Sequence, residues 1–252
     1  MADKSDTFRL YTDLAWLWPL WGNHETEYAR YCDHVIRLIR RYSLSPVVSL
    51  LDISCGGGKN IFTLKKQFRV TGIDLSSEML RLASELNPEC EFLEGDMRDF
   101  SLGRLFDSIL MDDGISHMTT RAELSSAFQT AFHHLAPGGV MVVTPDVTIE
   151  GFSQNRTVVT PASRNTKSEN VDVVFVENLY DPDPRDEHCE VTIICIIRER
   201  GALRIETGRC KIGLFSIDTW RQSLAKIGFA IHEEIYADDD NEYTTFACTK
   251  PK

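Results

Sequence analysis

Acidic residues and glycines stand at the ends of the apolar stretches of this chain. Asp52 belongs to the apolar run 47–53, and three consecutive glycines follow at 56–58. Two later apolar stretches end in Asp74 and Asp96. Glycine allows positive φ and leaves no Cβ in the way, so the backbone can approach a ligand closely, and the helix after such a loop presents free N–H groups. An acid and glycines in this arrangement are typical of a nucleotide-binding edge.

The spacing of the glycines decides between classes of nucleotide. A dinucleotide fingerprint has the form G-x-G-x-x-G, but Gly56 and Gly58 are followed by Ile61 where the third glycine should stand. NAD is therefore disfavoured. Taken alone, the glycines could also form an ordinary tight turn between a strand and a helix, so the interpretation depends on the motifs that follow.

These motifs resemble those of class I S-adenosylmethionine-dependent methyltransferases. Residues 52–58 (D-x-S-x-G-x-G) are similar to the family's D-x-G-x-G-x-G, with Ser54 in place of the first glycine. Gly-Asp-Met at 95–97 and Leu-x-Pro-Gly-Gly at 135–139 are similar to its later motifs and come in the same order. The resemblance implies an enzyme, a methyltransferase, with S-adenosyl-L-methionine as cofactor.

The resemblance also implies roles for individual residues. In this family the acid that ends the second strand accepts the ribose hydroxyls, and a carboxylate at Asp74 suits that task because it is acceptor-only when ionised. Asp96 is then expected to bind the exocyclic amine of adenine, and Met97 to pack on the ring. Alternatively, Asp74 could simply cap the helix that begins near Ser77. The expected cofactor contacts are Tyr11, Trp18, Asp52, Ser54, Cys55, Gly56, Gly58, Asp74, Leu75, Asp96, Met97 and Met111.

The fold implied by the resemblance is α/β, with a Rossmann-like seven-stranded sheet, an antiparallel last strand, helices on both faces and a small antiparallel β insertion. A chain of 252 residues that is 42% hydrophobic can bury a full core as one domain. We expect a single methyltransferase domain over 1–252. Its parts are an N-terminal helical lid (1–45), a cofactor-binding core (46–146), the β insertion (147–215) and the C-terminal part of the core sheet (216–252).

The insertion contains apolar, β-branched runs at 171–180, 189–198 and 202–215, which predict three antiparallel strands. Residues 151–170 are polar and predict a mobile loop. With an insertion in this place, the chain is similar to small-molecule N-methyltransferases of the amino-sugar N,N-dimethyltransferase type. In those enzymes a comparable sheet forms a substrate wall and a dimer contact, which implies a small-molecule acceptor and a possible homodimer.

Three residues after the fourth predicted strand are candidates for catalysis. In the resembling family the methyl acceptor lies over this strand, so the imidazole of His117 could accept a proton or orient the nucleophile near neutral pH. Asp112 and Asp113 could hold a polar or cationic acceptor, although side-chain alternation predicts that only one of them faces the cleft. The alternative for His117 is a packing or capping role. His133 and His134 are expected at the surface or at a helix end.

Aromatic residues gather near the N-terminus, where Tyr11 and three tryptophans at 16, 18 and 21 lie within eleven residues. In related enzymes a Tyr or Trp from an N-terminal helix closes over the bound sulfonium, and aromatic faces attract cations. Such a role is expected for Tyr11 and Trp18. Alternatively, an amphipathic helix could bury Leu14, Trp18 and Trp21 against the sheet.

Charge and composition limit the classes of partner that we expect for this protein. The formal net charge is −11, and the short basic cluster 37–41 is interleaved with apolar residues, so we expect no nucleic-acid substrate and a solvated helix face at 37–41. There is no apolar run of eighteen residues and no recognisable signal peptide, which predicts a cytoplasmic protein without membrane contact. The seven cysteines show no pairing pattern and are expected to be free thiols, and no metal site is expected.

The most probable function is therefore methyl transfer to a small polar molecule, with nitrogen favoured over oxygen as the acceptor atom. An O-methyltransferase of a small metabolite is the first alternative. A protein that binds S-adenosylmethionine without transferring its methyl group is the second, because Ser54 departs from the family motif.

Overall fold

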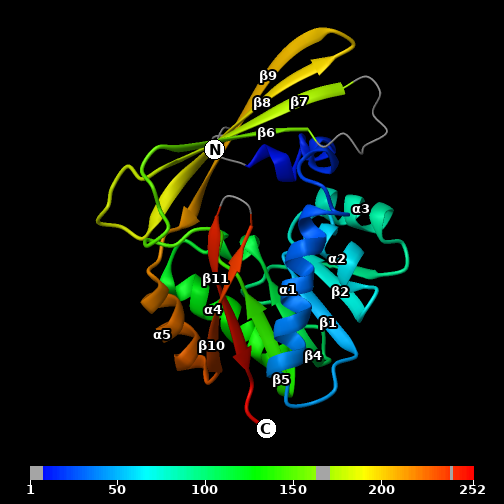
Figure 1. The fold of residues 1–252 in the computed structure, drawn as a ribbon, viewed down its shortest axis with the longest axis vertical. Helices are drawn as coiled ribbons and strands as arrows, with labels where there is room; N and C mark the ends of the chain where they lie inside the picture. The colour runs from blue at the N-terminus through cyan, green and yellow to red at the C-terminus, as the bar shows by residue number, and fades with distance from the viewer. Residues whose placement is uncertain (1–7, 163–170, 239–240) are drawn as a thin grey trace.

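The protein contains two β-sheets, and the second lies beyond one edge of the first (Figure 1). The structure, a computed structural model, describes residues 8–162, 171–238 and 241–252. The first sheet has seven strands and carries helices on both faces, while the second has four strands. The expected α/β architecture with a β insertion is therefore confirmed.

The seven-stranded sheet has the order β10-β11-β5-β4-β1-β2-β3. Strands β1 to β5 run parallel to one another, and β11 runs antiparallel to both β5 and β10, as the sequence predicts for the last strand. The strands are β1 (Ser49–Ile53), β2 (Arg69–Asp74), β3 (Glu91–Glu94), β4 (Phe106–Met111), β5 (Leu135–Val143), β10 (Ala230–Ala237) and β11 (Glu242–Thr249). Every residue of β1 is buried, as expected for a central strand covered on both faces.

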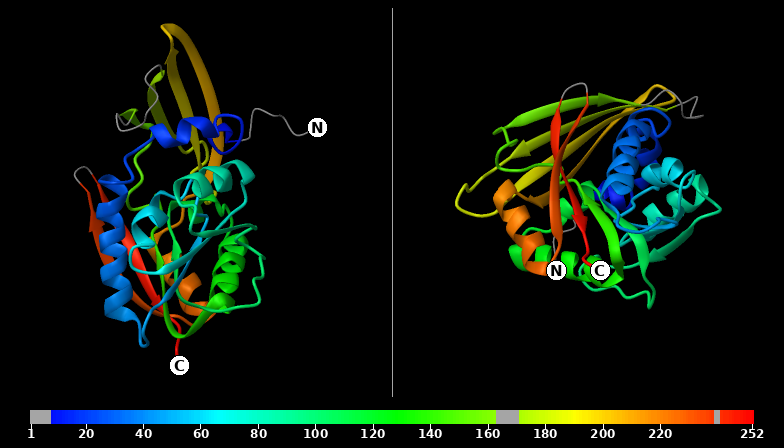
Figure 2. Two further views of the ribbon diagram at one scale, coloured as in Figure 1. Left: turned by 90° about the vertical axis from the view of Figure 1, so that its right-hand side faces the viewer. Right: turned by 60° about the horizontal axis from the view of Figure 1, so that its bottom comes forward.

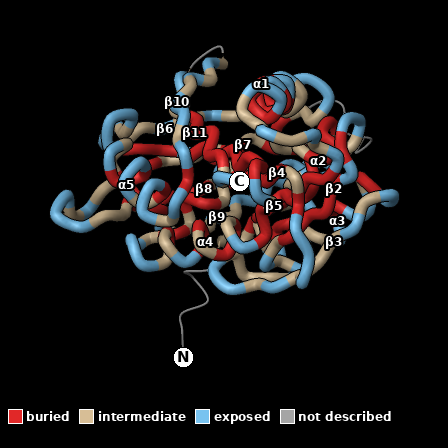
Figure 3. Tube along the Cα trace, turned by 90° about the horizontal axis from the view of Figure 1, so that it is seen from below, coloured by how far each residue is buried: buried red, intermediate tan, exposed pale blue. Residues whose placement is uncertain are grey.

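Two hydrophobic layers hold helices against this sheet, and Figure 3 shows the buried residues concentrated along its central strands. On one face lie α1 (Glu27–Tyr42), α2 (Lys59–Leu64) and α3 (Ser77–Leu86); on the other lie α4 (Arg121–His134) and α5 (Ile217–Ile227). Arg37, Arg40 and Arg41 lie on the exposed side of α1, which confirms the solvated face expected there. No helix in the described parts of the chain is long and apolar enough to cross a membrane.

Local sequence signals fix where several helices begin. The hydroxyls of Ser76, Thr120 and Ser216 each accept a hydrogen bond from the backbone N–H three residues later, and so cap α3, α4 and α5. Because β1, β2 and β4 are parallel, their carboxyl ends meet at one edge of the sheet. The glycine loop, the segment after Asp74 and the short helix η4 (Asp113–His117) all lie at this edge.

The second sheet is antiparallel and has the order β6-β7-β8-β9. Strands β7 (Val171–Tyr180), β8 (His188–Glu199) and β9 (Ala202–Gly213) match the three expected runs. The expectation of a loop over 151–170 is wrong for β6 (Arg156–Pro161), which pairs with the edge of β7; residues 163–170 lie outside the described residues. The four β-branched residues of β6 are too few to predict a strand from the sequence. Its proline is tolerated because β6 is an edge strand.

The N-terminal segment lies between the second sheet and the first, as Figures 1 and 2 show. It forms two short 3₁₀ helices, η2 (Arg9–Tyr11) and η3 (Ala15–Leu20), and Pro19 lies inside the second. Leu10, Leu14, Leu17 and Leu20 pack on the second sheet, while Ala15 contacts α3. The amphipathic α-helix considered for this segment is not formed, because proline cannot donate the backbone hydrogen bond that a longer helix needs.

Candidate functional site

A cavity of about 1050 Å³ lies where the two sheets and the N-terminal segment meet. Its wall is formed by the glycine loop, the carboxyl ends of β2 to β4, η4, the N-terminal aromatic residues and Cys210 of β9. The predicted site residues that line it are Tyr11, Trp18, Ser54, Cys55, Gly56, Asp74, Leu75, Asp96, Met97, Asp112, Asp113 and His117. The volume lies at the upper end of the range of about 300–1,000 Å³ typical of ligand sites, so a nucleoside-sized cofactor and a second small molecule can share it.

Asp74 holds the glycine loop in place. Its Oδ2 accepts a hydrogen bond from the backbone N–H of Gly56 at 2.7 Å, and its Oδ1 accepts one from Ser76 at 2.9 Å. Burial raises the pKa of Asp74. The residue that caps α3 is Ser76, so Asp74 is not needed as the cap, and it lines the cavity, where its carboxylate can accept a hydrogen bond from a ligand.

Three of the expected cofactor contacts do not line the cavity. Asp52 is 1% exposed beneath the glycine loop, and Met111 is completely buried in the core. Gly58 has φ +75°, and a Cβ there would lie 2.7 Å from the side-chain nitrogen of Asn87. These three residues support the wall from behind, and a direct contact with the cofactor stays a prediction for each.

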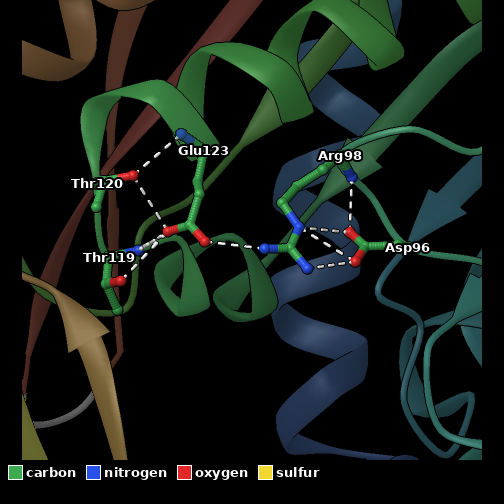
Figure 4. Close-up of polar contacts among 5 residues, drawn as sticks. All are labelled: Asp96, Arg98, Thr119, Thr120 and Glu123. Carbon is green, nitrogen blue, oxygen red and sulfur yellow. Dashed lines mark hydrogen bonds and ion pairs between the residues drawn. The ribbon is translucent and has the colours of Figure 1, made fainter.

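Asp96 lies in the cavity wall with a partner that the sequence did not reveal. The guanidinium of Arg98 binds both carboxylate oxygens, and the backbone N–H of Arg98 adds a third hydrogen bond (Figure 4). This pairing lowers the pKa of Asp96. Arg98 also contacts Glu123, which is bound to Thr119 and Thr120 at the start of α4. The acid expected to bind adenine is thus ionised and fixed in orientation.

The structure brings Tyr11 and His117 together from positions 106 residues apart, with the phenolic oxygen 3.3 Å from Nε2 of the imidazole. Burial lowers the pKa of His117 and raises that of Tyr11 well above its usual range. Near neutral pH the pair therefore consists of a neutral imidazole and a neutral phenol. His117 is not a packing residue of the core, because its ring lines the cavity.

Asp112 and Asp113 both line the cavity, so the expectation that only one of them would face it is wrong. The turn from β4 into η4 breaks the alternation of a strand. Asp112 accepts a hydrogen bond from Asn60 at 2.8 Å, whereas the carboxylate of Asp113 is accessible through the cavity. Burial and the neighbouring Asp112 raise the pKa of Asp113 well above its usual range.

Two further acids influence this region, and sequence analysis missed both. Asp146 follows β5 and Glu177 lies on β7, and each contributes to the raised pKa of Asp113. Burial, followed by the charge of Asp146, raises the pKa of Glu177 to about 7. Glu177 sits in an alternating strand with no distinctive neighbours, so no motif could have identified it. Sequence analysis also missed Lys59 and Tyr28, which line the cavity.

The indole of Trp18 lies directly on the glycine loop, since a Cβ at Gly57 would be 2.7 Å from its ring nitrogen. Trp21 instead stacks on Phe175 of the second sheet with ring centroids 4.6 Å apart, and Trp16 is partly exposed. Of the three tryptophans at this end of the chain, Trp18 is the one that closes over the loop.

The remaining predictions concern cysteines, metals and the histidines of α4. All seven cysteines are free, and burial raises the pKa of Cys55 well above its usual range. Among the described residues, no group of three acids, histidines or cysteines could hold a metal ion. His133 is exposed and His134 is the last residue of α4, as expected; His134 is buried, its Nδ1 lies 2.8 Å from the carbonyl oxygen of Thr130, and its Nε2 accepts a hydrogen bond from the N–H of Leu102. The segment that leads into β4 covers the side chain of His134.

Part of the chain is similar in sequence to a known family. Residues 50–139 match the family model described as a methyltransferase domain. These residues are therefore similar to a methyltransferase domain. The matched residues contribute the glycine loop, Asp74, Asp96 and His117, while Tyr11, Trp18 and Cys210, which also line the cavity, come from outside them.

Relatives of known name match about half of the chain. It is 40% identical over 121 residues to dTDP-3-amino-3,6-dideoxy-alpha-D-glucopyranose N,N-dimethyltransferase of Streptomyces fradiae, and the match covers 47% of each protein. It is 29% identical over 132 residues to trans-aconitate 2-methyltransferase of Azoarcus sp. (strain BH72), with 50% of each covered. The matched segment thus spans about half the length of these relatives.

A solved structure resembles the chain over nearly its whole length. Streptomyces venezuelae DesVI superposes with a TM-score of 0.79 and 24% identity, covering 95% of this chain and 96% of DesVI. At this level of identity the similarity establishes the fold, including the regions outside the methyltransferase domain.

Proposed function

We propose that this protein is an enzyme that transfers methyl groups from S-adenosyl-L-methionine to the amine of a small polar molecule, most specifically a nucleotide-linked amino sugar. The observation that carries the proposal is one cavity lined by two kinds of residue. Asp74 and the glycine loop suit the cofactor, and Tyr11, His117 and Asp113 suit an amine.

The residues present fit the cofactor. Asp74 lines the cavity and its carboxylate can accept a hydrogen bond from a ribose hydroxyl, and Asp96 is an ionised acceptor for the adenine amine. Gly56 has φ +52° and lets the loop backbone approach the ligand. When bound, S-adenosylmethionine supplies a methyl group that its sulfonium already activates, so the protein has mainly to orient the acceptor and exclude water.

Asp113, His117 and Tyr11 can bind an amine and take up its proton. An amine attacks only in its neutral form, whereas most alkyl amines are protonated near pH 7. In its ionised form Asp113 attracts the ammonium, and its raised pKa, which is closer to that of the amine, suits it to take the proton. The neutral His117, bound to Tyr11, can then accept a hydrogen bond from the nitrogen and hold its lone pair in one direction. Acids on this wall favour an amine over an acidic acceptor.

The assignment to an amino sugar is supported by the 40% identical relative, which is named for that class of substrate. O-methylation is the second candidate, because trans-aconitate 2-methyltransferase also matches the chain. That acceptor is an anion, however, and the carboxylates of Asp112 and Asp113 would repel it.

A second copy of the chain is proposed to cover the outer face of the second sheet. Cross-strand pairing places seven apolar residues on this face: Val159, Val174, Val176, Ile194, Ile196, Leu203 and Ile205. Val159, Leu203 and Ile205 are 53–61% exposed, and contiguous apolar surface of this kind marks interaction sites. The free cysteines fit a reducing compartment, so we also propose that the dimer works in the cytoplasm.

The test is turnover with defined acceptors. Protein, S-adenosylmethionine and a dTDP-linked amino sugar are incubated and analysed by mass spectrometry for the addition of one or two methyl groups, with trans-aconitate as the competing acceptor. Methylation of the amino sugar alone is expected. Methylation of trans-aconitate alone would favour the second candidate, and cofactor binding without any turnover on an amine panel would contradict the enzyme assignment.

The variant His117→Ala should lower the rate constant for turnover by about 100-fold while leaving the affinity for S-adenosylmethionine near that of the wild type. His133→Ala is the matched control, because His133 is exposed and lies outside the cavity wall. A parallel fall in turnover and cofactor affinity would mean that His117 has only a structural role.

A further inference from the structure

Lys59 is a buried basic residue at the foot of the glycine loop. It is the first residue of α2, is 4% exposed and lines the cavity. Its ammonium lies 4.9 Å from the ring centroid of Trp18 and 5.0 Å from that of Tyr28, and it donates a hydrogen bond to the carbonyl oxygen of Trp21. Two aromatic faces and one carbonyl thus surround a cation.

No ion pair between Lys59 and a carboxylate is present among the described residues. Glu27 on α1 attracts it only from a longer range. Burial lowers the pKa of Lys59 to about 7, because removing an ammonium from water is costly and aromatic faces replace only part of the lost hydration. An anion bound beside it would stabilise its charged form.

The other charges of the cavity wall make this lysine distinctive. Six acids line the cavity: Asp13, Asp74, Glu78, Asp96, Asp112 and Asp113. The other two basic residues of the wall are already paired, Arg81 with Glu78 and Glu85, and Arg98 with Asp96 and Glu123. Within the described residues, Lys59 is therefore the cation of this wall that has no carboxylate partner.

We propose that the ammonium of Lys59 binds the α-carboxylate of the methionine part of S-adenosylmethionine, and that Trp18 and Tyr28 hold the lysine in position for it. The inference rests on the proposed function and deepens it. The acids of the wall suit the sulfonium and the α-ammonium of this ligand, but they repel its carboxylate. Lys59 offsets that repulsion and selects ligands that carry the carboxylate.

Calorimetric titration with two ligands tests this. S-adenosylmethionine is compared with its decarboxylated analogue, which lacks only the carboxylate. The wild type should bind S-adenosylmethionine about 10–100-fold more tightly, as expected for a charged hydrogen bond. Lys59→Met should remove this preference by weakening the binding of S-adenosylmethionine alone. Lys66→Met, at an exposed lysine just beyond α2, should behave like the wild type.

The two proposals fail in different ways. If the wild type binds both ligands equally, or if Lys59→Met weakens both to the same extent, the role of Lys59 is refuted while the methyltransferase assignment stands. If the wild type binds neither ligand, the proposed function fails and the role of Lys59 with it. The wild-type comparison requires no substitution, so equal binding of the two ligands would refute the role of Lys59 even if Lys59→Met does not fold.

Discussion

Ser54, which stands in place of the first glycine of the family motif, lies against Gly114 of η4, and this contact gives a quantitative prediction. A Cβ added at Gly114 would lie 2.6 Å from the Cβ of Ser54, and closer still to its hydroxyl. Non-bonded carbons are at their best separation near 3.5–4.0 Å, so the two segments would have to move apart by about 1 Å. We therefore expect Gly114→Ala to lower the free energy of unfolding by about 1–3 kcal/mol, the usual cost of overpacking.

The same substitution should cost little when Ser54 is replaced by glycine. The next atom that the new Cβ would meet is the carbonyl oxygen of Ser54 at 3.6 Å, which is an ordinary contact. Ser54→Gly alone should change stability by less than about 1 kcal/mol. Relief of the left-handed backbone at φ +67° gains about 1–2 kcal/mol, and the greater freedom of glycine in the unfolded chain offsets part of it.

Urea unfolding of the wild type, both single variants and the double variant measures this coupling. The double variant should be more stable than the sum of the single effects predicts, by about 1–3 kcal/mol. Effects that add within about 0.5 kcal/mol would refute the reasoning, because they would show that Ser54 is not what Gly114 accommodates.

Three further predictions concern the ribose acid, a buried acid and the outer face. Asp74→Asn should weaken S-adenosylmethionine binding by about 1–3 kcal/mol in calorimetry, because one oxygen that accepts hydrogen bonds becomes a donor; unchanged affinity would exclude the ribose role. Folded Glu177 keeps its proton up to about pH 7 and unfolded Glu loses it near 4.5, so Glu177 makes stability fall as pH rises between these values. Urea unfolding of Glu177→Gln should show that fall reduced by about 2–3 kcal/mol, and an unaltered pH profile would contradict the burial of this acid. Ile196→Lys should convert the proposed dimer to a monomer in sedimentation velocity, with exposed Leu75→Lys as the control; a variant that stays dimeric would place the interface elsewhere.

The parts of the site that sequence analysis predicted are those made by local chemistry. Apolar runs, an acid and glycines within 47–58 describe a strand and its turn, and the structure has them there. Ser76, Thr120 and Ser216 cap helices through bonds that span three residues. Such interactions involve neighbours in the chain, so they can be predicted from sequence.

The errors and omissions fall where distant contacts decide. His134 ends α4, as one of the two alternatives predicted, but its burial depends on the segment before β4, which supplies the N–H of Leu102 32 residues away. The short strand β6 exists because the edge of β7 offers hydrogen bonds to it, from Val174 13 residues after Pro161 to Leu179 23 residues after Arg156. A pattern of immediate neighbours in the chain indicates neither contact.

The apolar runs, the glycine loop and the acids at the strand ends could be recognised in the sequence, because these signals involve only a few neighbouring residues, and the resemblance that they carry implied the seven-stranded sheet. How the cavity is closed depends instead on contacts between distant segments. Tyr11 meets His117 across 106 residues, Glu177 reaches the acids of η4 from the second sheet, and Lys59 lies between aromatic rings of two N-terminal segments. Burial at these places sets the charges of the site, and burial depends on segments that only the folded chain brings together.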